Sequence, residues 1–250
     1  MGIFGFGRAE TLYFPGCYSS SYLTDKVENY KRILKKLKMK FETIKDLNCC
    51  GGFLDESGYE QDLRKLARQN FELLKNKETQ TIITNCPLCL YTFSERYKDL
   101  LSQWNIKVEF ILATILRELR EDSNLIKSYT PEEVCYYDSC YLARYSKLID
   151  EPREILRMMG YRLIELPKNK EETLCCGSCG GLSISNKELS DKISEDFIRI
   201  LIRKKIKKVI VSDPRAYKVL RDSLERLGIK DIIILEISEV ICDALDLSRE

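Results

Sequence analysis

Five cysteines in the first half of the sequence have a spacing that suits a metal centre: Cys17, Cys49, Cys50, Cys86 and Cys89. Thirty-one residues separate the first from the second, thirty-five separate the third from the fourth, and two separate the last pair. Thiolates select zinc, copper(I) or iron–sulfur clusters. Five thiols exceed the four that a tetrahedral zinc ion or an ordinary cubane uses. The set predicts an unusual iron–sulfur cluster, or a cluster with one cysteine left for chemistry, and structural zinc is the main alternative.

The rest of the composition narrows the chemistry. The 250 residues include 11 cysteines and no histidine. The missing histidine excludes Ser-His-Asp triads, Cys-His nucleophiles and histidine-ligated zinc enzymes. The segment Met1–Arg8 has no apolar core of signal-peptide length. Clustered cysteines in a cytosolic chain bind metal or do redox work more often than they form disulfides.

The net charge and the hydropathy of the sequence limit the kinds of partner that we expect. The sequence has 41 Lys and Arg against 39 Asp and Glu, a net charge of +2, which gives no sign of a nucleic-acid-binding surface. The longest apolar runs, such as Ile232–Leu235, have the length of a strand and not of a bilayer span. We expect a cytoplasmic protein with no direct membrane insertion, so that work at a membrane would require a partner subunit as a tether.

The sequence contains an internal repeat. CCGG begins at Cys49 and CCGSCGG begins at Cys175, and these two cysteines are 126 positions apart. Cys86 and Ser212 are separated by the same 126 positions. Matching distances between matching motifs are typical of duplication. We therefore expect two duplicated domains, residues 1–125 and 126–250, divided within the polar stretch 120–131.

Both halves alternate strand-like and helix-like segments, which predicts an α/β fold with a small, mostly parallel sheet flanked by helices in each domain. The expected strands are Leu12–Phe14, Phe41–Ile44, Thr81–Thr84, Val108–Ile111, Cys135–Tyr137, Arg162–Leu166, Val209–Val211 and Ile232–Leu235. The main expected helices are Asp25–Leu37, Gln61–Lys75, Glu151–Met159 and Lys187–Lys204. The cysteines of both motifs are expected in loops beyond the carboxyl ends of strands, where such sheets bind ligands.

The second half departs from the first. It has four thiols in the corresponding region: Cys140, Cys175, Cys176 and Cys179. Ser212 and Arg215 stand where the pair Cys86 and Cys89 stands in the first half, with Asp213 between them as a possible oxygen ligand. This set could hold zinc, a cubane cluster or nothing. Two further cysteines, Cys135 and Cys242, have apolar neighbours and are expected in the core.

The whole pattern resembles the CCG, or cysteine-rich, domain. This domain occurs in the B subunit of heterodisulfide reductase, in iron–sulfur subunits of glycolate, lactate and anaerobic glycerol-3-phosphate dehydrogenases, and in a noncanonical succinate dehydrogenase subunit. The five first-half cysteines match its motif, and YDSCYLAR around Cys140 resembles its HDPCHLAR. The resemblance implies that the five cysteines bind a noncubane [4Fe-4S] cluster. The sequence has no fused ferredoxin module, so the implied electron donor is a separate ferredoxin-like iron–sulfur subunit, a flavoprotein subunit, or both.

Three functions follow as hypotheses. The first is a redox protein that passes electrons through the cluster to a thiol–disulfide pair or another acceptor, either as a subunit or as a disulfide reductase with a second redox site at Cys140 and Cys175–Cys179. The second is an electron-transfer subunit of a flavin-dependent 2-hydroxy-acid or succinate dehydrogenase. The third is a non-enzymatic zinc-binding scaffold, which iron analysis separates from the other two.

Overall fold

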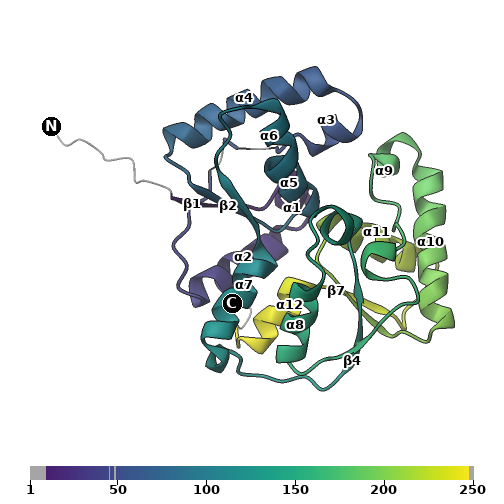
Figure 1. Cartoon of the computed structure of the whole chain (residues 1–250). Helices are drawn as coiled ribbons and strands as arrows, with labels where there is room; N and C mark the ends of the chain where they lie inside the picture. Colours follow the sequence, from purple (N-terminus) through teal and green to yellow (C-terminus); the bar gives the residue numbers. More distant parts are fainter. Residues whose placement is uncertain (1–9, 45, 48, 248–250) are drawn as a thin grey trace.

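Two parallel β-sheets organise the chain, one in each half (Figure 1). The computed structural model describes residues 10–44, 46–47 and 49–247. The strand order is β1-β2-β3 in the first sheet and β5-β4-β6-β7 in the second, and every paired neighbour is parallel. The strands are β1 (Thr11–Phe14), β2 (Thr81–Thr84), β3 (Lys107–Phe110), β4 (Glu133–Tyr137), β5 (Arg162–Ile164), β6 (Lys208–Val211) and β7 (Ile233–Glu236).

Helices connect successive strands, as parallel pairing requires. Those of the first half are α1 (Cys17–Tyr22), α2 (Thr24–Lys36), α3 (Gly52–Glu56), α4 (Glu60–Asn76), α5 (Pro87–Tyr91), the π-helix η1 (Thr92–Arg96), α6 (Tyr97–Leu100), α7 (Ile111–Glu121) and η2 (Ser123–Leu125). Those of the second half are the π-helix η3 (Tyr141–Tyr145), α8 (Asp150–Met158), η4 (Lys170–Glu172), α9 (Leu182–Ser185), α10 (Lys187–Arg203), α11 (Pro214–Arg226) and α12 (Ile237–Ala244).

The two halves share one hydrophobic core. Helix α2 packs against α12, and α7 packs against α8; Figure 1 shows these four helices gathered in the lower middle of the view. Their buried faces contribute Tyr30, Ile115, Ile155 and Ile241, each fully buried, to a single cluster. Burial of such side chains supplies about 1.5–3 kcal/mol each. The shared core therefore fixes the two sheets relative to each other.

Each sheet also has a core of its own on the opposite face. In the first half, Leu63 of α4 and Phe93 of η1 pack with Leu12 and Ile82 of the sheet. In the second half, residues of α10 and α11 pack against β4, β6 and β7. Both sheets are thus covered on both faces, which is the usual condition of an all-parallel sheet.

Most of the expected elements are confirmed within one or two residues, but the strand expected at Phe41–Ile44 is wrong. Glu42 forms one isolated parallel bridge to Leu12, with hydrogen bonds from its N–H to Thr11 and to its carbonyl from Tyr13. The first sheet therefore has three strands. In the second half, the counterpart of the segment Phe41–Ile44 is β5, which pairs with β4 over three residues. The division at residues 125 and 126 falls at the end of η2 and remains a prediction.

A buried carboxyl at the contact between the halves predicts a pH dependence of stability. Glu236 ends β7 and accepts a hydrogen bond of 2.5 Å from the hydroxyl of Tyr30 in α2. Burial raises the pKa of Glu236 to about 7. The folded state therefore favours the protonated carboxyl, so the contribution of Glu236 to stability is complete below the unfolded pKa near 4.5 and decreases by about 3 kcal/mol as the pH rises through 7.

Urea unfolding at pH 4.5, 6 and 8 measures this effect. The variant Glu236→Gln keeps the size of the side chain and removes its titration, so its stability should change less over this range than that of the parent. An identical pH profile for the two proteins would contradict the assignment.

Candidate metal centre

Two neighbouring strands of the first sheet bring cysteines to the same edge. Phe14 at the end of β1 pairs with Thr84 at the end of β2. Cys17 then begins α1, and Cys86 precedes α5, in which Pro87 is the first residue. Because the carboxyl ends of parallel strands meet at one edge, these cysteines lie close together.

Two of the predicted ligands lie in short helices, although the sequence pattern predicted loops for all five. Cys17 is the first residue of α1, and Cys89 lies within α5, three residues beyond Cys86. The prediction failed because helices of five or six residues carry too little periodicity to be read from sequence. The adjacent cysteines Cys49 and Cys50 do lie in a loop, directly before α3.

Gly16 allows Cys17, which follows β1, to lie close to Cys86 and Cys89, which follow β2. Its backbone has φ of +82°, and a Cβ at this position would lie 3.1 Å from Sγ of Cys89 and 3.3 Å from Cβ of Cys86. Such contacts are tighter than ordinary van der Waals contact. A side chain at residue 16 is excluded both by the backbone conformation and by the cysteines.

The variant Gly16→Ala is expected to lose metal as well as stability. With φ of +82° and ψ of 156° the backbone lies in a region essentially restricted to glycine, which costs alanine about 1–3 kcal/mol, and the added methyl displaces Cys89. Gly58→Ala is the matched control, because Gly58 also has positive φ, +78°, but a methyl group added there would have no atom within 4 Å. Metal content per chain should fall for the first variant and stay at the parental value for the second. Equal metal content in both would show that Gly16 is needed only for the turn.

Backbone and side-chain hydrogen bonds hold the CCG loop. The N–H of Gly51 donates to Sγ of Cys49 at 3.3 Å, and the N–H of Gly52 donates to Sγ of Cys50 at 3.4 Å. The carbonyl of Cys50 accepts from the Tyr97 hydroxyl at 3.0 Å. These contacts orient two sulfur atoms and direct N–H dipoles at them, an arrangement that stabilises negative charge on the sulfurs.

The five first-half thiols shift one another's pKa values. Hydrogen bonding couples the titration of Cys17 with Cys49, of Cys49 with Cys50, of Cys50 with Cys89 and of Cys89 with Cys86. Hydrogen bonds from Cys17 and Cys50 lower the pKa of Cys49 to about 3. A hydrogen bond from Cys89 likewise lowers the pKa of Cys86, while the pKa values of the three donor thiols are raised by these same contacts.

The thiols are not grouped around a single metal position. Among the described residues, no group of three or more His, Cys, Asp or Glu side chains is placed to hold one metal ion. A cluster distributes its ligands over several iron atoms and takes thiolate sulfur as its ligand. An iron–sulfur cluster on these five thiols, three of which are buried, remains a prediction.

The second half repeats the loop geometry with fewer contacts between thiols. Sγ of Cys140 lies 3.2 Å from Sγ of Cys179, which also hydrogen-bonds to Cys175. The N–H of Gly177 donates to Sγ of Cys175 at 3.3 Å, as the N–H of Gly51 does to Cys49. A hydrogen bond from Cys179 lowers the pKa of Cys175 to about 6. The fourth thiol, Cys176, is buried against Ser178, with its Sγ 3.2 Å from that hydroxyl.

The residues that replace the second CxxC pair have structural partners. The Ser212 hydroxyl lies 2.6 Å from that of Tyr136. Asp213, expected as a possible metal ligand, caps α11 by accepting from the N–H of Arg215 at 2.9 Å and also accepts from the Ser139 hydroxyl at 2.7 Å. Both carboxylate oxygens are thus engaged in hydrogen bonds within the protein.

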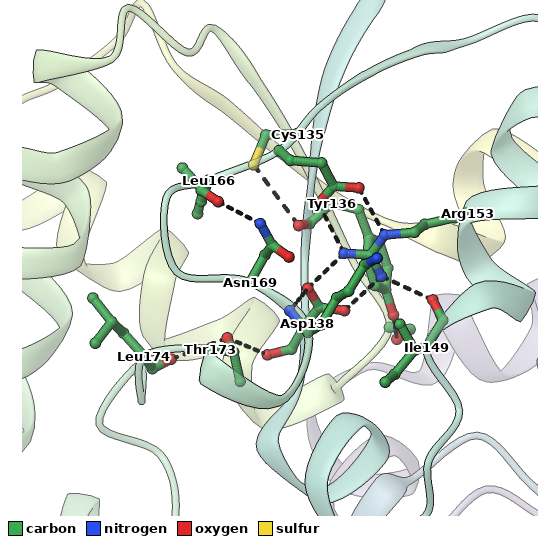
Figure 2. Close-up of polar contacts among 12 residues, drawn as sticks. Cys135, Tyr136, Asp138, Ile149, Arg153, Leu166, Asn169, Thr173 and Leu174 are labelled. Carbon is green, nitrogen blue, oxygen red and sulfur yellow. Dashed lines mark hydrogen bonds and ion pairs between the residues drawn. The ribbon is translucent and has the colours of Figure 1, made fainter.

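A buried ion pair includes Asp138, which lies two residues before Cys140. Figure 2 shows Arg153 facing Asp138, and Nη1 and Nη2 donate to its two oxygens at 2.7 Å each. Nε of Arg153 donates to Glu165 at 2.7 Å. The carbonyl of Asp138 accepts from the Thr173 hydroxyl at 2.9 Å. One network therefore connects Asp138, which follows β4 and lies two residues before Cys140, with the segment that leads to Cys175.

Glu56 connects the two cysteine regions, and no sequence pattern indicated it. Its side chain, at the end of α3, is 6% exposed. It accepts from the Tyr141 hydroxyl at 2.8 Å, from the N–H of Gly180 at 3.1 Å and from Nη1 of Arg215 at 3.3 Å. All three donors belong to the second half. A glutamate late in a short helix has no sequence signal for such a role.

The two cysteines expected in the core, Cys135 and Cys242, are buried. Cys135 lies in β4 and Cys242 in α12. Burial raises the pKa of each thiol, to about 12 and about 11 respectively. Both thiols are therefore protonated at neutral pH and act as core residues.

A duplicated α/β fold with thiols at the carboxyl edges of its sheets defines a class of cysteine-rich proteins, and comparison with known sequences identifies the family. The cysteine-rich domain model, CCG, matches residues 11–94 and again residues 134–220. The chain belongs to this family of iron–sulfur oxidoreductase and electron-transfer proteins.

Three relatives match over most of the chain. The D subunit of the dihydromethanophenazine:CoB–CoM heterodisulfide reductase of Methanosarcina mazei is 26% identical over 97% of the chain and 61% of its own length. An uncharacterized iron–sulfur protein of Methanocaldococcus jannaschii is 25% identical over 92% of the chain and 45% of its length. The B subunit of the fumarate reductase (CoM/CoB) of Methanothermobacter marburgensis is 24% identical over 92% and 45%. The chain spans between 45% and 61% of the length of these relatives.

Proposed function

We propose that the chain binds a noncubane [4Fe-4S] cluster on Cys17, Cys49, Cys50, Cys86 and Cys89 and transfers electrons through it to a thiol–disulfide acceptor. The observation that carries the proposal is the gathering of these five thiols at one edge of the first sheet, where Gly16 lies against Cys86 and Cys89 and neighbouring thiols shift one another's pKa values. The relative named as part of a heterodisulfide reductase supports the acceptor.

The chemistry divides between the cluster and the protein. When bound, the cluster supplies one-electron transfer. Reduction of a disulfide takes two electrons and two protons, breaks one S–S bond and yields two thiols, and a partner protein supplies the electrons. The N–H groups of Gly51 and Gly52 stabilise charge on the ligand sulfurs. Cys17 and Cys49 are half-buried, while the other three thiols are buried. A substrate would therefore approach the cluster from the side of Cys17 and Cys49.

The second domain is proposed to hold zinc or a second cluster on Cys140, Cys175, Cys176 and Cys179. The contacts of Cys179 with Cys140 and Cys175 bring three of these thiols together. The replacement of the CxxC pair by Ser212 and Arg215 makes a site unlike the first. We place the domain division at residues 125 and 126.

Partner subunits are part of the proposal. Two of the named relatives are subunits of reductases, and we infer that a ferredoxin-like iron–sulfur subunit, a flavoprotein subunit, or both, deliver electrons to this chain. Among the described residues, no helix combines the length and apolarity needed to cross a bilayer. Attachment to a membrane would be made through such a partner.

A second candidate function has its own support. One relative is named as part of a fumarate reductase, which favours an electron-transfer subunit of a flavin-dependent dehydrogenase of the 2-hydroxy-acid or succinate type. In that case the cluster would receive electrons from a flavoprotein and would not act on a disulfide.

The two functions separate in one assay on protein purified without oxygen. Chemically reduced viologen serves as electron donor, and bis(2-hydroxyethyl) disulfide serves as acceptor. Disulfide-dependent oxidation of the donor, two electrons for each disulfide, is expected for the first function. A cluster that is reduced and reoxidised but gives no disulfide turnover would support the electron-transfer role instead.

A further inference from the structure

The side chain of Arg215 extends from the second half of the chain to the first. Arg215 lies in the first turn of α11, and its side chain is 4% exposed. Its Nη1 donates to the carboxylate of Glu56 at 3.3 Å, and its guanidinium lies over the ring of Phe53, 5.1 Å from the ring centre. Phe53 and Glu56 both belong to α3, which follows the first CCG motif. A cation of the second half is therefore buried against the first cysteine region.

Two donors of this guanidinium have no hydrogen-bond partner in the part of the chain that the structure describes. Nε and Nη2 of Arg215 are both buried and make no hydrogen bond to any described residue. The same edge of Arg153, another buried arginine, donates to the two oxygens of Glu165 at 2.7 Å and 2.9 Å. Buried donors of a charged group are costly unless an acceptor satisfies them. Since neither atom reaches solvent, such an acceptor has to lie inside the protein, beside the guanidinium.

The charged and titratable groups around Arg215 come from both cysteine regions. Burial tends to lower the pKa of the guanidinium, but Coulombic interactions with four groups raise it above its ordinary value: Asp213, Cys86, Glu56 and Cys179. The two carboxylates already accept hydrogen bonds from other residues. The other two groups are thiols, one from each cysteine region, so the guanidinium lies within electrostatic range of both regions.

The first cysteine region is the one that Arg215 affects more. Of the two thiols, Cys86 has the larger Coulombic effect on Arg215. A hydrogen bond from Cys89 and the charge of Arg215 both lower the pKa of Cys86. Arg215 also lies 126 positions after Cys89, so it stands where a complete second motif would have its last cysteine. The second region thus has a cation in place of one thiol, and that cation acts on a ligand proposed for the first.

We propose that Arg215 compensates the charge of the cluster on the first-half cysteines, with Nε and Nη2 donating hydrogen bonds to sulfur, and that it raises the reduction potential of this cluster. Net charge, burial and hydrogen bonds to sulfur set such potentials. Reduction adds one negative charge, and a buried cation stabilises that charge because water screens it little. The inference rests on the cluster in the proposed function and is independent of the electron acceptor.

Redox titration of the full chain, purified without oxygen and followed by absorbance and electron paramagnetic resonance, tests the proposal. Arg215→Met removes the charge and keeps most of the length of the side chain. We expect its ratio of reduced to oxidised cluster at a fixed potential to fall about tenfold, which corresponds to about 59 mV for one electron. Arg215→Lys keeps a positive charge but loses the two-donor edge. Its potential should lie between those of the parent and Arg215→Met.

Glu56→Gln should shift the potential in the opposite direction. The amide keeps the size of the side chain and one oxygen for the Tyr141 and Gly180 donors, but it removes the negative charge that offsets Arg215. The potential should therefore rise above that of the parent. Damage to the fold would not shift two variants with opposite signs. Arg162→Met is the matched control, because it removes a cation that is 70% exposed, and it should keep the parental potential.

The outcomes separate this inference from the proposed function. A parental potential in Arg215→Met, or in both Arg215→Lys and Glu56→Gln if Arg215→Met does not fold, would overturn the inference and leave the cluster in place. Loss of zinc or iron from the second site, with the first-site potential unchanged, would assign Arg215 to the second site and overturn it as well. The expected shifts without disulfide turnover would support the role of Arg215 and remove disulfide reduction from the proposed function. A parent chain without iron would contradict both.

Discussion

Replacing Cys89 by serine is expected to lower bound iron from about four atoms to fewer than one atom per chain, taking a single [4Fe-4S] cluster as the parent content. Cys89 is coupled to two of the other thiols, because hydrogen bonding links its titration with that of both Cys50 and Cys86. It is also buried, so water cannot readily replace the lost ligand. Iron and sulfide analysis of protein purified without oxygen measures the change, and disulfide turnover should disappear with the iron.

Cys242→Ser is the matched control for this substitution. Cys242 is a buried thiol of the shared core, with its Sγ 3.8 Å from the carbonyl of Asn29. Both substitutions exchange a buried sulfur atom for oxygen. Because Cys242 is far in sequence from both cysteine motifs, the Cys242→Ser variant should retain the iron content of the parent. Parental iron in Cys89→Ser, with the fold intact, would remove Cys89 from the ligand set.

Replacing Arg153 by methionine is expected to destabilise the protein by about 3–5 kcal/mol. Arg153 is 1% exposed and is the only cation that the structure places against the buried Asp138, among the described residues. Its loss leaves Asp138, which is 3% exposed, as an uncompensated buried charge. The midpoint of urea unfolding, with the slope unchanged, measures the loss.

Arg120→Met tests whether burial is the cause. Arg120 forms the same two-bond contact with Glu154, but its side chain is 59% exposed, and surface pairs contribute little. This variant should unfold close to the parental midpoint. Similar midpoints for the two variants would contradict the account of the buried pair. In Arg153→Met protein that remains folded, iron at the first site should be retained, because its ligands belong to the other sheet.

The sequence predicts where the cysteines gather better than it predicts the residues around them. Cys17 and Cys86 follow strands that pair in parallel, so their proximity follows from the order of elements alone. The CCG loop also repeats as expected, since Gly51 and Gly177 have φ values of +86° and +89° and each donates to the sulfur two residues earlier. Local motif and strand order are sufficient for these features.

Contacts between the halves depend on long-range packing that local patterns do not encode. Glu56 and Arg215 are 159 positions apart, and neither has a neighbour in sequence that indicates the other. The shared core of α2, α7, α8 and α12 likewise depends on how two amphipathic faces meet. The incorrect strand at Phe41–Ile44 has a related cause, because its apolar residues pack on the cores while its backbone makes a single bridge.

Iron, acid-labile sulfide and zinc per chain, measured on protein purified without oxygen, test the central claim most directly. We predict about four irons with matching sulfide for the first site alone, and either one zinc or about four further irons if the second site is filled. Zinc without iron in such protein would contradict the account and leave a structural zinc protein.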